Sequence, residues 1–413
     1  MRATQIVALR AFKRLRNEYW CLGKVDEFTL RTGEKVKILH TSDWHIGIKL
    51  ATYDYLPDQR VFADWLLRTV KSEKIDVVLI AGDIFDRAIP SGESIDLVDE
   101  IFSKLIANDI SVVVISGNHD SAERLNFCSK AMEAAGLYIR TEQRDAKDIG
   151  DPIEISKNGE SVFIIPVPYL DPQRVIEIDD AERSHGGLVD AILKSRMQQV
   201  PDPAKTIVMS HAFVAGGTES DSERKVSIGG TSRVAVDVYK DFGYVALGHL
   251  HRPQQVAGQN IFYSGTPLQY SFSEEHQKSV RIIEVGQTIE SRTIDIPIGP
   301  TVVTLTDSIE NLLKKSEYKV HEEHLVRVKL TDSGYQLNVF DRVSTRFRNL
   351  LDLSYVALDA GTEFGGSTSE LTHLSPDEIV QQYIHAVHVE SVTPEIGQFI
   401  QESVHRVTVG GKQ

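Results

Sequence analysis

The sequence predicts a layered α/β fold, and three observations support this prediction. Apolar runs of strand length alternate with longer stretches that place apolar residues at helical spacing. The helical stretches extend from Arg60 to Lys74 and from Ser94 to Asn108. The apolar runs end at glycine or at charged residues, as buried strands do. This alternation is typical of parallel strands joined by right-handed crossovers.

A first domain is expected over residues 36–296. Its first strands are predicted from Val36 onward and at residues 76–80 and 111–115. Residues 171–205 are expected to form a loop and a helix, and the Gly- and Ser-rich residues 211–244 a long surface loop beside the site. The remaining strands, of which the last two would close a second sheet, are expected at residues 161–168, 206–209, 244–247, 260–264 and 279–285.

A smaller domain is expected over residues 300–360, after a linker at Pro297–Pro300. Its predicted order is β-α-β-α-β, with helices near residues 308–316 and 338–351 and strands at residues 301–305, 325–330 and 354–358. Residues 361–413 are expected to hold a linker and two amphipathic helices, the first beginning at Ser375-Pro376. These helices either dock on a partner or pack back on the domain.

Residues 1–35 differ from the rest, because they are basic and lack an apolar core pattern. They are expected to be a poorly ordered extension or the product of an upstream start, with a basic amphipathic arm as the alternative. No apolar segment resembles a secretory signal.

The composition is that of a water-soluble protein. Of 413 residues, 41% are hydrophobic and 25% charged, and no apolar run approaches the roughly 20 residues that cross a bilayer. The two cysteines, Cys21 and Cys128, cannot form a disulfide framework, so a cytoplasmic location is expected. The net charge of −14 argues against an extended basic face for nucleic acid, unless bound dications or a partner protein supply positive charge.

Five apolar runs end in residues that bind hard metal ions. The five segments contain Asp43-Trp44-His45, Gly82-Asp83, Gly117-Asn118-His119-Asp120, His211 and Gly248-His249-Leu250-His251. Each segment alone is common in proteins without a metal. Together, in this order and each after a predicted strand, they indicate a two-cation site at the carboxyl ends of the strands.

Such a site needs one carboxylate that binds both ions, and Asp83 is predicted to be this ligand. Asp43, His45 and His251 would complete one ion, and Asn118, His211 and His249 the other. Carboxylate, imidazole and amide oxygen without thiolate suit Mn²⁺ better than structural zinc. His119 would protonate the leaving oxygen or stabilise the pentacoordinate phosphate. Asp120 would accept the ring N–H of His119, and Asp86 would tune the site.

The five segments resemble the motifs of the calcineurin-like metallophosphoesterase superfamily, and most specifically those of the SbcD family of bacterial nucleases. Particularly similar are His40-Thr41-Ser42-Asp43-Trp44-His45, Ser116-Gly117-Asn118-His119-Asp120 and Gly248-His249-Leu250-His251-Arg252-Pro253. The resemblance covers residues 36–360 and implies a β-sandwich flanked by helices, followed by a capping domain. It also implies His119 as the catalytic histidine.

The resemblance further implies a DNA nuclease that uses two divalent cations, most often Mn²⁺, with Mg²⁺ as the alternative. Members are 3′–5′ double-strand exonucleases and single-strand or hairpin endonucleases. They dimerise and work with the coiled-coil ATPase SbcC in DNA repair, recombination and replication near the bacterial nucleoid. Two alternatives remain open from the residues: a phosphodiesterase for small substrates, and a non-catalytic scaffold of an ATPase complex.

Overall fold

The computed structural model describes residues 35–141, 149, 151–157, 159–172, 182, 184–220, 223, 233–332 and 338–356. The basic segment 1–34 and the segment 357–413, with its predicted linker and helices, lie outside these residues. Within the described part, no helix combines the length and the apolar character that a membrane span requires.

A six-stranded mixed sheet forms the first layer, in the order β16-β15-β1-β4-β5-β6. The strands β1, β4, β5 and β6 are parallel, whereas β15 and β16 run antiparallel to their neighbours. Their bounds are β1 Val36–Thr41, β4 Val77–Ala81, β5 Ser111–Ile115, β6 Leu137–Arg140, β15 Ser279–Val285 and β16 Ile289–Asp295.

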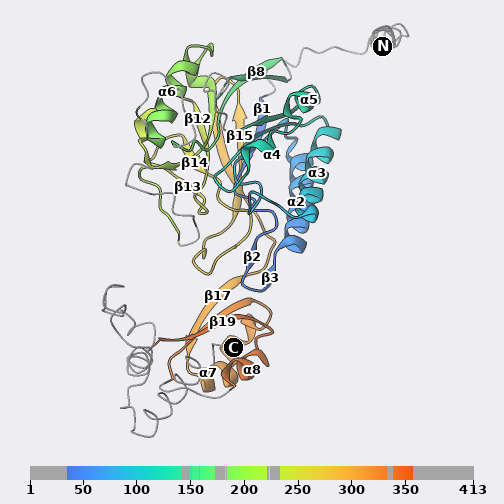
Figure 1. Ribbon diagram of the computed structural model, residues 1–413, viewed down its shortest axis with the longest axis vertical. Helices are drawn as coiled ribbons and strands as arrows, with labels where there is room; N and C mark the ends of the chain where they lie inside the picture. Colours follow the sequence, from blue (N-terminus) through green and yellow to red (C-terminus); the bar gives the residue numbers. More distant parts are fainter. Residues whose placement is uncertain are drawn as a thin grey trace, which may run out of the picture.

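Two helices cover the outer face of this sheet, α2 (Leu56–Glu73) and α3 (Gly92–Ala107) (Figure 1). Leu66, Val98 and Ile101 pack against Val78 and Val112 of the sheet. Helix α2 begins four residues before the predicted start. Pro57 suits the first helical turn, and the Asp54 carboxylate accepts the Leu56 N–H at 3.0 Å, so the first turn is capped locally.

A second six-stranded sheet has the order β13-β14-β12-β9-β8-β7. Its central strands are parallel, and helix α6 (His185–Met197) covers its outer face. The strand bounds are β7 Ile153–Lys157, β8 Glu160–Val167, β9 Thr206–His211, β12 Tyr244–Gly248, β13 Gln254–Gln255 and β14 Ile261–Tyr263.

The two sheets pack face to face around a shared apolar core. Members of this core with 0% exposure include Ile38, Leu79 and Val113 from the first sheet, and Ile164, Met209 and Ala246 from the second. His40 also joins the sheets, because its Nδ1 lies 3.1 Å from the Tyr244 hydroxyl of the second sheet. The predicted β-sandwich flanked by helices is therefore confirmed.

Short elements occupy the connections. They are β2 Lys49–Leu50, β3 Tyr53–Asp54, α4 Ala122–Leu125, α5 Ser129–Glu133, the 3₁₀ turns η2 Pro203–Lys205 and η3 Val236–Tyr239, β10 Phe213–Val214 and β11 Arg233–Val234. The segment predicted as one long loop after His211 thus contains β10, β11 and η3 among its described residues. The edge strands β6, β7 and β16 were not predicted, because polar residues alternate along them and no ligand motif follows them.

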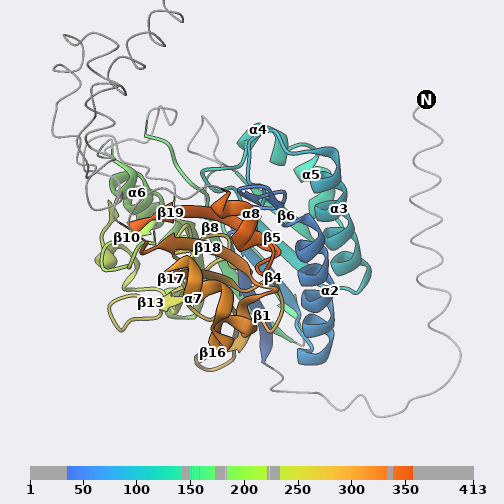
Figure 2. The same ribbon diagram turned by 90° about the horizontal axis from the view of Figure 1, so that it is seen from below.

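The smaller domain is a three-stranded parallel sheet with two short helices, shown below the sandwich in Figure 1 and in front of it in Figure 2. Its elements are β17 Val302–Asp307, α7 Ile309–Lys314, η4 Ser316–His321, β18 Leu325–Leu330, α8 Val339–Ser344 and β19 Asn349–Tyr355. Phe347, with 0% exposure, anchors its separate core.

Two predicted boundaries in this domain are wrong. The helix expected to reach Leu351 ends at Ser344, and the strand expected at residues 354–358 is Asn349–Tyr355. Residues 349–355 pair in parallel with β18, which supplies main-chain hydrogen bonds that a helix continuing past Phe347 would lose.

Candidate metal centre

The predicted ligands converge at the carboxyl ends of the strands where the two sheets meet. Asp43 and His45 follow β1, Asp83 follows β4 and Asn118 follows β5. From the second sheet, His211 ends β9, and His249 and His251 follow β12. Residues separated by two hundred positions therefore share one site, as the sequence analysis predicted.

One group of ligands consists of Asp43, His45 and His251, which we call the first half-site. One ligand atom of each lies within 4.8 Å of the others, and all three residues are buried. Both ring nitrogens of His45 are buried and make no hydrogen bond to any described residue. Leaving two buried ring nitrogens unsatisfied is unfavourable, and a bound cation would satisfy one of them.

The opposite group consists of Asn118, His211 and His249, which we call the second half-site. The Asn118 side-chain oxygen lies 3.0 Å from His211 Nε2 and 3.1 Å from His249 Nδ1. Such separations suit donor atoms that bind one cation at about 2.1 Å.

Asp83 lies between the half-sites. Its Oδ2 atom is 3.7 Å from His45 Nε2 and 3.4 Å from His211 Nε2, so one carboxylate oxygen faces both groups. A bridging carboxylate needs this placement. The ligand set fits two divalent cations and contains no thiolate.

Four of the ligand residues have left-handed backbone conformations. The φ angles are 51° at Asp43, 44° at His45, 50° at Asp83 and 105° at His249. Such angles are costly for residues other than glycine and cluster at functional sites. They let the chain turn sharply as each strand ends, which directs the side chains to a common point.

Glycines make room for the ligands. A Cβ atom at Gly117 would overlap the Asp83 carboxylate, and one at Gly248 would overlap the Ala81 carbonyl and lie 2.9 Å from His211 Nδ1. The motif glycines therefore reflect close packing around the site.

Burial and neighbouring charges act in opposite directions on the carboxylates. Burial raises the pKa of Asp43 to about 6, because the ionised form is poorly solvated. Burial would also raise the pKa of Asp83, but the neighbouring His211 outweighs it and holds this pKa well below its usual range. A bound dication would favour the ionised form of both groups.

The histidines divide into two kinds. Burial lowers the pKa values of His45 and His249 well below the usual range, so both rings are neutral, as metal ligands must be. Burial also opposes protonation of His211, but the Asp83 carboxylate outweighs it and raises the pKa of His211 to about 9. Its Nδ1 donates to the Ala81 carbonyl at 2.9 Å, so the additional proton lies on Nε2.

His119 and Asp86 lie beside the first half-site. The His119 N–H donates to Asp83 Oδ1 at 2.8 Å, and its ring lies edge-on to that of His45, with centroids 4.7 Å apart. The structure corrects the role predicted for Asp120, because the His119 Nδ1 atom donates at 2.8 Å to the Asp86 main-chain carbonyl. The Asp120 carboxylate instead accepts main-chain N–H groups of Ile84, Phe85 and Gly117, and thereby ties two ligand loops together.

Sequence reasoning did not single out several buried polar residues around the site. Gln59 in α2 donates to the main-chain carbonyls of Trp44 and His45, at 3.2 and 2.9 Å, and so holds the turn after β1. Glu274 contacts the ring of His251 and Glu223 its main chain. Both glutamates lie in polar stretches that resemble exposed loops, so the sequence carried no signal for them.

Comparison with known proteins identifies the class. Residues 36–253, more than half of the chain, match the family described as calcineurin-like phosphoesterase. The chain therefore belongs to the calcineurin-like phosphoesterase family.

Two relatives narrow the comparison, and both are named as the SbcD component of the nuclease SbcCD. The relative from Staphylococcus epidermidis is 32% identical over 333 residues, which cover 80% of this chain and 88% of the relative. The relative from Staphylococcus saprophyticus is 29% identical over 361 residues, covering 87% and 95%. Both matches are longer than the family segment, and the predicted resemblance to the SbcD family is confirmed. A crystal structure of a dimetal phosphatase from Danio rerio is 13% identical, with a TM-score of 0.38, and covers 63% of this chain and 99% of its own.

Proposed function

We propose that this chain is the Mn²⁺-dependent nuclease component of a bacterial complex that processes DNA ends. The observation that carries this proposal is the position of Asp83, with one oxygen facing two sets of nitrogen and oxygen ligands and with His119 hydrogen-bonded to its other oxygen. The nuclease names of the two staphylococcal relatives support DNA as the substrate.

Two bound cations would neutralise the phosphodiester and activate the attacking water. The protein groups place these cations: Asp83 binds both, the first half-site completes one and the second half-site the other. Because the sets are assembled before substrate arrives, little reorganisation is needed during the reaction.

His119 is proposed to supply the proton that the leaving oxygen needs. Its Nδ1–H is engaged by the Asp86 carbonyl, so Nε2 is the atom that transfers the proton. The hydrogen bond from its main-chain N–H to Asp83 keeps the ring next to the bridging carboxylate. Asp86 therefore has a proposed positioning role, through its carbonyl group.

The proposed activities are 3′–5′ exonuclease action on duplex DNA and endonuclease action on single strands and hairpins. The proposed partner is an SbcC-type coiled-coil ATPase, with a homodimer of this chain inside a heterotetramer in the cytoplasm. The smaller domain would help to shape the DNA site, and residues 361–413 would dock on the ATPase. With a net charge of −14, much of the basic DNA surface is expected on the partner.

The test is to purify the chain with Mn²⁺ and to assay end-labelled duplex, hairpin and single-stranded DNA, with and without the ATPase. Mn²⁺-dependent cleavage of these substrates is expected. Hydrolysis of bis-p-nitrophenyl phosphate without cleavage of DNA would instead indicate a small-substrate phosphodiesterase. Absence of bound metal and of both activities would indicate a scaffold.

A further inference from the structure

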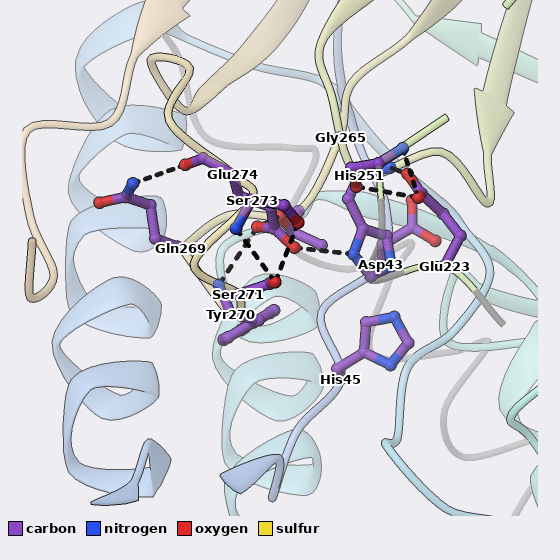
Figure 3. A network of polar contacts seen from close by, with 12 residues as sticks. Asp43, His45, Glu223, His251, Gly265, Gln269, Tyr270, Ser271, Ser273 and Glu274 are labelled. Carbon is purple, nitrogen blue, oxygen red and sulfur yellow. Dashed lines mark hydrogen bonds and ion pairs between the residues drawn. The ribbon is translucent and has the colours of Figure 1, made fainter. Parts of the chain in front are cut away.

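Glu274 is a carboxylate with 0% exposure in the connection between β14 and β15, and it contacts a predicted metal ligand. Its Oε1 atom accepts a hydrogen bond from His251 Nδ1 at 2.9 Å. Figure 3 shows Glu274 and Glu223 around His251, next to Asp43 and His45. A buried carboxylate is costly unless its environment compensates the charge.

That compensation comes from three donors to the other oxygen. Glu274 Oε2 accepts from Lys278 Nζ at 2.6 Å, Thr266 Oγ1 at 3.1 Å and the Tyr270 N–H at 3.2 Å. Lys278 is itself only 5% exposed, so it forms a buried ion pair with Glu274. This set of donors keeps the carboxylate ionised.

An ionised carboxylate can only accept hydrogen bonds. The contact with Glu274 therefore requires the proton of His251 on Nδ1, and the lone pair of the neutral ring is then on Nε2. The alternative tautomer would place a lone pair opposite Glu274 and a proton on Nε2. Only the first tautomer offers Nε2 to a cation.

We propose that Glu274 is a positioning residue for the first half-site: it fixes the tautomer and the orientation of His251, and Lys278 holds the carboxylate in place. This inference rests on the proposed function, since it assumes that the half-site binds a cation.

The main chain of His251 is held independently of Glu274. Glu223 Oε1 accepts the His251 N–H at 2.9 Å, and the Thr266 N–H donates to the His251 carbonyl at 3.2 Å. Changing Glu274 therefore acts on the ring of His251, while its main chain keeps these anchors.

A glutamine at position 274 is informative because it is nearly isosteric. Lys278 and the Tyr270 N–H both need an acceptor, so the amide oxygen would face them and the amide NH₂ would face His251. His251 Nδ1 would then have to accept, which moves the ring proton to Nε2. We expect Glu274→Gln to weaken binding of one of two Mn²⁺ ions by about 10- to 100-fold, the range for residues that orient metal ligands.

Glu274→Gln leaves Lys278 buried without its anion and can impair folding. The double variant E274L/K278M removes both charges, and Lys278→Met alone serves as its matched control because it keeps the carboxylate. Mn²⁺ titration followed by electron paramagnetic resonance gives the number of ions and the affinities, and a thermal unfolding curve checks folding.

E274L/K278M is expected to lose affinity for one ion by about 10- to 100-fold, whereas Lys278→Met stays within about threefold of the wild type. Equal Mn²⁺ affinities in these two folded variants would overturn the role of Glu274. A wild-type protein that fails to bind two Mn²⁺ ions would instead overturn the proposed function, so the two failures are distinguishable.

Discussion

The two half-sites of the metal centre are supported in different ways. In the second half-site, His211 donates to the main-chain carbonyl of Ala81, and Gly248 allows the strands to approach. In the first half-site, His251 donates to the side chain of Glu274, which depends in turn on Lys278. Main-chain support persists through most substitutions, but side-chain support does not. The first half-site is therefore the one that distant sequence changes can alter.

Removing the shared ligand tests whether the half-sites depend on one another. Asp83→Asn is expected to abolish binding of at least one ion and to lower DNA cleavage by at least about 1,000-fold, because groups that act as a unit fail together. Mn²⁺ stoichiometry and cleavage of labelled duplex measure this effect. Asp307→Asn in the smaller domain is the matched control, since that carboxylate binds Asn311, Tyr318 and Lys315 only within its own domain. Normal cleavage by Asp83→Asn would contradict the bridging role.

His119 belongs to neither half-site, so its removal separates chemistry from metal binding. His119→Ala is expected to keep two Mn²⁺ ions and to lower cleavage by at least about 100-fold, the contribution of general acid catalysis. Parallel measurements of metal content and cleavage rate test this. Cleavage at the wild-type rate with metal bound would exclude the assigned role.

Acidity should affect the second half-site in a defined direction. In the metal-free protein, Asp83 raises the pKa of His211 to about 9 against the effect of burial, so Nε2 holds a proton at neutral pH. Metal binding must displace that proton, so Mn²⁺ affinity should rise by about tenfold per pH unit from pH 7 to pH 9 and then level off. Titrations in this range measure the slope. A flat profile would show that His211 does not compete with a proton for the ion.

Substitution of the close-packed glycine should disturb only the second half-site. Gly248→Ala is expected to destabilise the protein by about 1–3 kcal/mol through overpacking and to weaken one ion, because the new methyl group meets Ala81 and His211. Thermal unfolding and Mn²⁺ titration measure both effects. Gly92→Ala is the control, since nothing lies within 4 Å of a Cβ there and no change in metal binding is expected. Equal behaviour of the two variants would remove the distinction between the half-sites.

Much of the fold could be predicted because the central strands are continuous apolar runs. The strands β4, β5 and β12 are buried on both faces, so their sequences differ clearly from the neighbouring helices. Edge strands such as β7 and β16 are exposed on one side and carry polar residues, which removes that signal. The end of α8 was misplaced for a related reason, because pairing with β18 outweighs the local helical pattern.

The ligands could be read from the chain because each follows a strand directly, and the carboxyl ends of neighbouring strands meet at one edge. Local order along the sequence was therefore enough to gather Asp43, Asp83 and His211. The partners of those ligands depend on contacts between segments far apart in the chain. The Asp86 carbonyl replaces Asp120 beside His119, and Glu274 reaches His251 across a loop, because hydrogen-bond partners are set by the packed arrangement of the main chain rather than by spacing in sequence.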